Sequence, residues 1–210
     1  MNRLLDETAG DPLQLGPDDA GRCLSLADYE RAHFAEGSVY EVIDGFLIVS
    51  PSPTPSHFFW TCVVQRRLMD YAKRHTRIIE MVGGGAEIPI PHRSGLTRPI
   101  PDLAAYGKFR VSSRTRWTAL CPVIVVEVVS KRRAWKDTVR NRALYWLATG
   151  IKEYWIVDPR TNDLAPSLHT LARIPGHDDW TEVTVPFGRT FKSKALPGFS
   201  LNLRSASQSR

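Results

Sequence analysis

The chain has 210 residues, of which 42% are hydrophobic and 24% are charged, values that are ordinary for one globular domain. No stretch approaches 18 consecutive apolar residues, so we expect no helix that spans a membrane. The net charge of +6 favours an anionic partner, nucleic acid first, although many proteins are mildly basic without one.

The three cysteines are scattered, odd in number and free of any C-x-x-C pattern, which argues against a disulfide framework and a cysteine metal site. The N-terminal segment is interrupted by acidic residues and shows no apolar signal core. We therefore expect a protein of the reducing cytoplasm.

The first part of the chain predicts a leader, a short helix and a hairpin. Residues 1–22 are rich in Gly, Asp and Pro without a period, and we expect a disordered leader. Ser25 is a candidate cap for a helix over about 26–35. Two apolar runs, 40–43 and 46–49, flank Asp44-Gly45, a strong signal for a β-hairpin.

A proline-rich segment over 50–56 then leads into a predicted amphipathic helix over about 56–74. His57 stands at the start of this helix, where it is either a cap-region residue or a ligand. Strands are expected over 78–82 and 86–90, separated by three glycines that favour a turn.

The most informative stretch is the β-branched run 123–129, typical of a strand buried on both faces, with Glu127 inside it. A buried carboxylate must be paired, protonated or bound to a metal. Asp102 stands at the start of a short strand over 103–106. It is either a turn residue or, with Glu127, one of two acids that converge on a divalent cation.

The chain after Glu127 turns basic, and its second half predicts a helix. Asp137 is expected at or near the N-cap and Gly150 just after the end. A strand over 152–158 then implies a right-handed crossover and a parallel pair with the Glu127 strand. A hairpin over 164–171 and 180–186, an edge-lying segment over 195–203 and a frayed tail over 205–210 complete the chain.

Two acids on neighbouring strands with a basic helix after them fit metal-dependent hydrolysis of phosphodiester bonds. One or two Mg²⁺ ions (or Mn²⁺) would be held by Asp102, Glu127 and a carbonyl near Val128. Glu41 is a candidate third carboxylate, or else a surface residue of its strand. The basic run is either a solvated helix face or a nucleic-acid contact; the candidate contacts are Arg132, Arg133, Lys136 and Arg142.

A set of motifs occurs in the order found in one known family. They are Tyr40-Glu-Val-Ile-Asp-Gly45, Ser50-Pro-Ser-Pro53, Pro101-Asp102, Val126-Glu-Val-Val-Ser130, Asp137, Ala143-Leu-Tyr145, Gly150 and Glu153-Tyr-Trp-Ile-Val-Asp-Pro159. On these residues the chain resembles the Uma2 (DUF820) family of restriction-endonuclease-like proteins, within the PD-(D/E)XK nucleases. The resemblance covers roughly residues 25–190.

The resemblance implies an α/β fold with a restriction-endonuclease-like core over 23–204, in which helices flank a mixed central sheet and hairpins are added. It also implies an endonuclease that acts on DNA, with metal at Asp102 and Glu127. Nucleases that cut both strands often pair, so a homodimer stays open, and no interface can be recognised in the sequence.

One departure from the family pattern concerns the catalytic lysine. The family tends to place this lysine in the helix after the Glu127 strand, where this chain has Asn141. Candidate substitutes are Lys131, at the end of the strand, and Arg140 or Arg142, on either side of Asn141. The alternative is an impaired nuclease fold that binds nucleic acid without cutting it.

Overall fold

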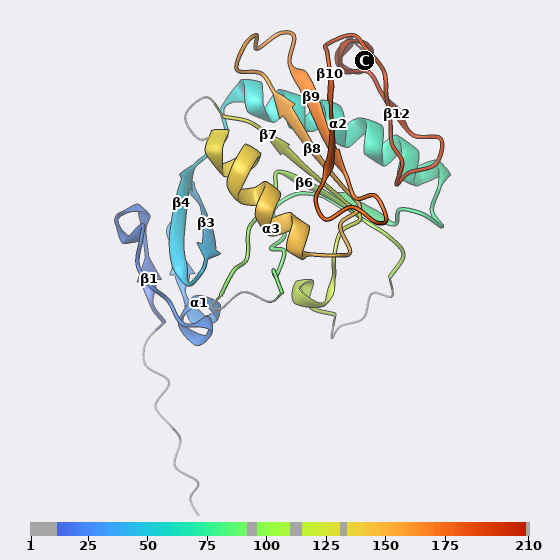
Figure 1. Cartoon of the computed structure of the whole chain (residues 1–210). Helices are drawn as coiled ribbons and strands as arrows, with labels where there is room; N and C mark the ends of the chain where they lie inside the picture. The colour runs from blue at the N-terminus through green and yellow to red at the C-terminus, as the bar shows by residue number, and fades with distance from the viewer. Residues whose placement is uncertain (1–11, 92–95, 110–114, 131–133, 209–210) are drawn as a thin grey trace, which may run out of the picture. The chain divides into compact units, whose positions relative to one another are not determined.

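The computed structural model describes residues 12–91, 96–109, 115–130 and 134–208. The chain divides into two compact units, one of Met1–Ser52 with Ser94–Thr97 and one of Pro53–Arg93 with Arg98–Arg210. Figure 1 shows the elements of both along the chain. No helix in the described part is long and apolar enough to cross a membrane.

The first unit is built around the predicted hairpin, in which β3 (Ser38–Ile43) pairs antiparallel with β4 (Phe46–Pro51). Asp44 and Gly45 at the turn both have positive φ, 51° and 84°, as a type I′ turn requires. The Thr97 hydroxyl accepts from the Asp44 N–H at 2.9 Å and donates to Asp44 Oδ1 at 3.1 Å. These bonds fix the turn.

Regular structure in the first unit begins inside the segment 1–22, which the sequence predicts to be a disordered leader. A two-residue strand, β1 (Gln14–Leu15), pairs parallel with β2 (His33–Phe34), and a 3₁₀ turn follows β1 at Pro17–Asp19. The helix α1 (Leu26–Arg31) is capped by Ser25, as predicted, but ends before β2. A small core fills this unit and includes Leu15, Leu24, Tyr29, Tyr40, Val42 and Leu47.

The second unit holds a six-stranded mixed sheet with the strand order β10-β9-β8-β7-β6-β5. Its strands are β5 (Met81–Gly83), β6 (Leu103–Tyr106), β7 (Ile124–Val128), β8 (Glu153–Asp158), β9 (Ser167–Ala172) and β10 (Thr181–Val185). Only β7 and β8 pair in parallel, which confirms that prediction; the other pairs are antiparallel. The predicted α/β class with a mixed central sheet is confirmed.

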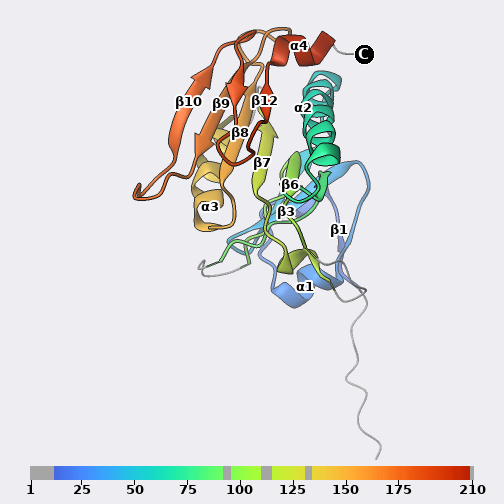
Figure 2. The same ribbon diagram turned by 90° about the vertical axis from the view of Figure 1, so that its right-hand side faces the viewer.

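Two helices cover opposite faces of this sheet (Figures 1 and 2). The long helix α2 (Pro55–Arg74) packs its buried side chains on alternate residues of β7, Ile124, Val126 and Val128. On the other face lie α3 (Arg142–Leu147) and a π-helical segment before it, Lys136–Asn141. A short ladder of β11 (Phe191–Lys192) with β12 (Ser200–Leu201) and the helix α4 (Leu203–Gln208) follow at the C-terminal end.

Several sequence-based expectations need correction. Residues 86–90 are described but form no strand, and α4 covers most of the segment that we expected to be frayed. Asp137 is not an N-cap, because Ala134 and Trp135 before it are already helical. The segment Lys136–Asn141 is π-helical, with bonds between residues five apart instead of four, and the sequence pattern does not reveal this irregularity.

Glu153 anchors the segment after β10 to the central sheet. Its buried carboxylate accepts bonds from Trp155 Nε1 (2.9 Å), the Ser193 hydroxyl (2.8 Å) and the backbone N–H groups of Lys194 (2.6 Å) and Ala195 (3.0 Å). A buried charge with this many donors stabilises the fold only while the set is complete.

We therefore predict that Glu153→Ala lowers the free energy of unfolding by about 3 kcal/mol, because four donors, of which Trp155 Nε1 is buried, lose their acceptor. Urea unfolding followed by tryptophan fluorescence measures the change. Glu36→Ala, at an exposed glutamate, is the matched control and should change stability by less than about 0.5 kcal/mol. Equal losses in the two variants would contradict this role for Glu153.

Candidate functional site

Asp102 and Glu127 meet at one end of the sheet. Leu103 of β6 pairs with Val126 of β7, so the antiparallel register sets Asp102 across from Glu127. The Asp102 N–H donates to Glu127 Oε2 at 3.2 Å, and the Val128 N–H donates to Asp102 Oδ2 at 2.7 Å. Each carboxylate is thus held by the backbone of the opposite strand.

The helical segment opposite β7 supplies two further donors to Glu127. Asn141 Nδ2 lies 2.8 Å from Glu127 Oε1, and the Tyr145 hydroxyl lies 3.0 Å from the same oxygen. Arg140 Nε donates to Asn141 Oδ1 at 3.0 Å, which turns the amide nitrogen of Asn141 toward Glu127. The residue at the family's lysine position therefore binds the site glutamate with a neutral amide.

Asp102 has a partner that the sequence did not predict. His57 Nε2 lies 3.0 Å from Asp102 Oδ2, with side chains that are 16% and 23% exposed. His57 is on the first turn of α2, where Thr54 Oγ1 accepts its backbone N–H at 3.3 Å. The other ring nitrogen, Nδ1, is buried and has no hydrogen-bond partner among the described residues.

Charges around the site shift several pKa values. Burial alone would raise the pKa of Asp102, but the hydrogen bond and charge of His57, the Val128 N–H and the charge of Lys136 together lower it. Burial would lower the pKa of His57, but Asp102 and then Asp137 raise it. The site thus favours an ionised Asp102 beside a cation.

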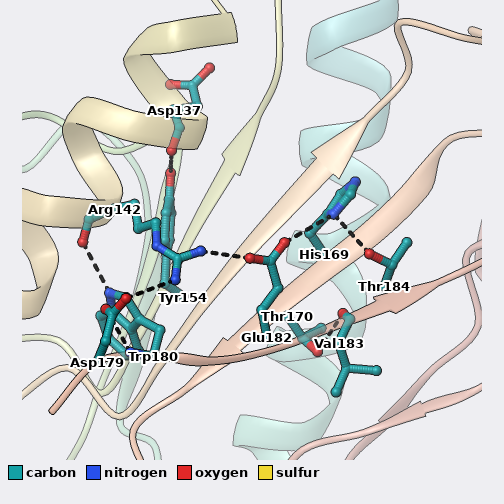
Figure 3. A network of polar contacts seen from close by, with 10 residues as sticks. All are labelled: Asp137, Arg142, Tyr154, His169, Thr170, Asp179, Trp180, Glu182, Val183 and Thr184. Atoms are coloured by element: carbon teal, nitrogen blue, oxygen red, sulfur yellow. Dashed lines mark hydrogen bonds and ion pairs between the residues drawn. The ribbon is translucent and has the colours of Figure 1, made fainter.

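The pKa of Tyr154 is also shifted, first by burial and then by the acids of the site. Its hydroxyl donates to the Asp137 carbonyl at 2.9 Å (Figure 3). Burial, followed by the negative charges of Glu127, Asp137 and Asp102, raises the pKa of Tyr154 well above its usual value. Burial and these acids therefore both favour the neutral form of the phenol.

The other predicted residues are placed as follows. Glu41 lies in β3 of the first unit opposite Ile48, and its side chain is buried; its role as a third carboxylate stays a prediction. Lys136 is near enough to lower the pKa of Asp102. Three predicted residues lie outside the described part of the chain: Lys131, Arg132 and Arg133.

Arg142 is engaged in a network of its own (Figure 3). Its guanidinium contacts Glu182 Oε2 at 2.6 Å and Asp179 Oδ2 at 3.0 Å, and its carbonyl accepts from Trp180 Nε1 at 3.0 Å. Burial would lower its pKa, but these two carboxylates raise it. Arg142 links α3 to β10, and its contact with nucleic acid stays a prediction.

The donor set at this end of the sheet suits a divalent ion in part. Two carboxylates with water and a carbonyl form an oxygen set of the kind Mg²⁺ prefers. His57 Nε2 lies against Asp102 at the same place, 3.0 Å from Oδ2. In the described residues, however, no three His, Cys, Asp or Glu side chains are arranged to hold a metal. Asp102 and Glu127 would supply the protein ligands, and water the rest.

Comparison with known proteins supports the fold and the family. Residues 26–204 match the Uma2 family, whose description is "Putative restriction endonuclease". No curated protein matches the chain. A crystal structure described as a "putative nuclease belonging to DUF820", from Anabaena variabilis ATCC 29413, is similar with a TM-score of 0.66 and 13% identity, over 88% of this chain and 98% of that chain. Since the family match covers most of the sequence, the chain belongs to the Uma2 (DUF820) family.

Proposed function

We propose that this chain is a metal-dependent endonuclease that hydrolyses phosphodiester bonds in DNA. The observation that carries the proposal is the reciprocal pair of Asp102 and Glu127, held across β6 and β7 by backbone donors. Membership of a family described as "Putative restriction endonuclease" supports the same reaction class. The proposed cofactor is Mg²⁺ or Mn²⁺.

In this proposal the carboxylates bind the ion and the basic residues bind the substrate. A bound ion would lower the pKa of a water molecule and offset charge on the scissile phosphate. Asn141 and Tyr145 orient Glu127, while the Val128 N–H orients Asp102. Lys136, whose charge helps to lower the pKa of Asp102, would attract a phosphate to the site.

A second candidate function follows from Asn141. An amide can orient Glu127, but it cannot supply the positive charge or the proton transfer of a lysine. The chain would then be a nuclease fold that binds nucleic acid without turnover. Such a protein would show DNA affinity that falls steeply with salt, because phosphate contacts release counterions.

A nicking assay on supercoiled plasmid separates these two functions. We expect the wild type to nick the plasmid slowly with Mg²⁺ or Mn²⁺ and not with EDTA. Asp102→Asn and Glu127→Gln should each lower the rate on the order of 100-fold, because each removes a charged ligand. Salt-sensitive binding without any nicking would leave only the second function.

Asp70→Asn is the matched control, since this exposed acid lies on α2 outside the site. It should nick the plasmid at the wild-type rate. Equal rates for Asp102→Asn and the wild type would contradict the proposed site.

Restoring the lysine provides a gain-of-function prediction. Asn141→Lys should raise the nicking rate by about 10-fold or more, because a positioned general acid or base commonly contributes 10²-fold or more. Circular dichroism would check that the variant folds, since Asn141 is fully buried. An unchanged rate in a folded variant would argue that another residue already fills the lysine's role.

A further inference from the structure

The side chain of His57 has one polar contact in the described structure, and that contact is Asp102. Capping of α2 does not use the imidazole, because the Thr54 hydroxyl performs it. Nδ1 is buried and has no hydrogen-bond partner, so folding removes water from this nitrogen without replacing the hydrogen bond that water made. A structural role in the helix cap therefore does not account for the position of the ring.

The distance between His57 and Asp102 suits two neighbouring ligands of one ion. Ligands at right angles, each about 2.1 Å from a metal, stand about 3 Å apart. His57 Nε2 and Asp102 Oδ2 are separated by 3.0 Å. The Val128 N–H holds the same oxygen at 2.7 Å, as an outer-shell donor commonly does for a ligating carboxylate.

The chemistry of the pair favours some ions over others. Mg²⁺ prefers oxygen ligands, whereas imidazole nitrogen suits first-row transition ions. The side chain of Asp102 is 23% exposed, so it is not sealed from solvent. His57 and Asp102 would therefore supply one nitrogen and one oxygen ligand to an ion that accepts both.

We infer that His57 binds the same ion as Asp102 and makes the site prefer a transition ion such as Mn²⁺ over Mg²⁺. This inference rests on the proposed function, because it assumes that Asp102 binds a metal. It goes beyond that function by assigning a nitrogen ligand and an ion preference to this chain.

Electron paramagnetic resonance of Mn²⁺ tests the assignment directly, at a mildly alkaline pH where the imidazole is neutral. Loss of the free-ion signal measures binding, and pulsed spectra detect a ¹⁴N nucleus bound to the ion. The wild type should bind Mn²⁺ with a ¹⁴N coupling. His57→Gln should lose the coupling and bind Mn²⁺ about 10-fold more weakly. Its affinity for Mg²⁺, measured by competition with Mn²⁺, should change by less than about 3-fold.

Two variants make the outcomes distinguishable. Gln keeps a donor for Asp102 but no imidazole nitrogen, and His177→Gln, at an exposed loop histidine, should leave both measurements unchanged. If the wild type and Asp102→Asn bind Mn²⁺ equally, or neither binds it, the proposed function itself fails. If Asp102→Asn abolishes binding but His57→Gln binds as tightly as the wild type or more tightly, without loss of ¹⁴N coupling, only this inference is overturned.

Discussion

The exchange of backbone and carboxylate hydrogen bonds between Asp102 and the end of β7 organises the candidate site. The register of β6 on β7 sets which residues face each other, and a slip of one residue would turn every side chain to the opposite face. Because β7 is buried on both faces, its register is strongly specified by packing. The geometry of the two acids is therefore a consequence of how the hydrophobic core closes.

A second set of donors arranges Glu127 from the helix side. Asn141 and Tyr145 are four residues apart and reach the same oxygen, since residues at this spacing share one helix face. The π-helical segment ends at Asn141, and π-bulges occur frequently at functional sites. Arg140 in turn orients the amide. Asn141 still holds Glu127 in place, but it brings no positive charge. The positive charges that affect the site come from His57 and Lys136, which lower the pKa of Asp102.

Much of this arrangement could be predicted from the sequence because the signals are local. The apolar run around Glu127, the Asp44-Gly45 turn and the amphipathic pattern of α2 each specify their own element. Asp102 and Glu127 could be paired only by assuming which strands are neighbours, and the structure bears out that assumption. The positions of Lys131, Arg132 and Arg133 lie outside the described residues.

The sequence marks His57 as a cap-region residue or a ligand, but its contact with Asp102 could not be found in this way. Its contact with Asp102 depends on where the first turn of α2 meets the end of the sheet, a tertiary relation 45 residues apart in the chain. The π-helical segment could not be predicted either, because the sequence indicated a regular helix that starts at or near Asp137. The place of His57 at the start of a predicted helix left a ligand role open, and this is the sequence signal that pointed to it.

The most direct test of the account is a crystal of the wild type soaked in Mn²⁺, with anomalous diffraction recorded at the manganese edge. The account predicts one peak within bonding distance, about 2.2 Å, of a carboxylate oxygen of Asp102, with Glu127 bound directly or through water. The absence of a peak at saturating Mn²⁺, or a peak whose ligands include neither acid, would contradict it.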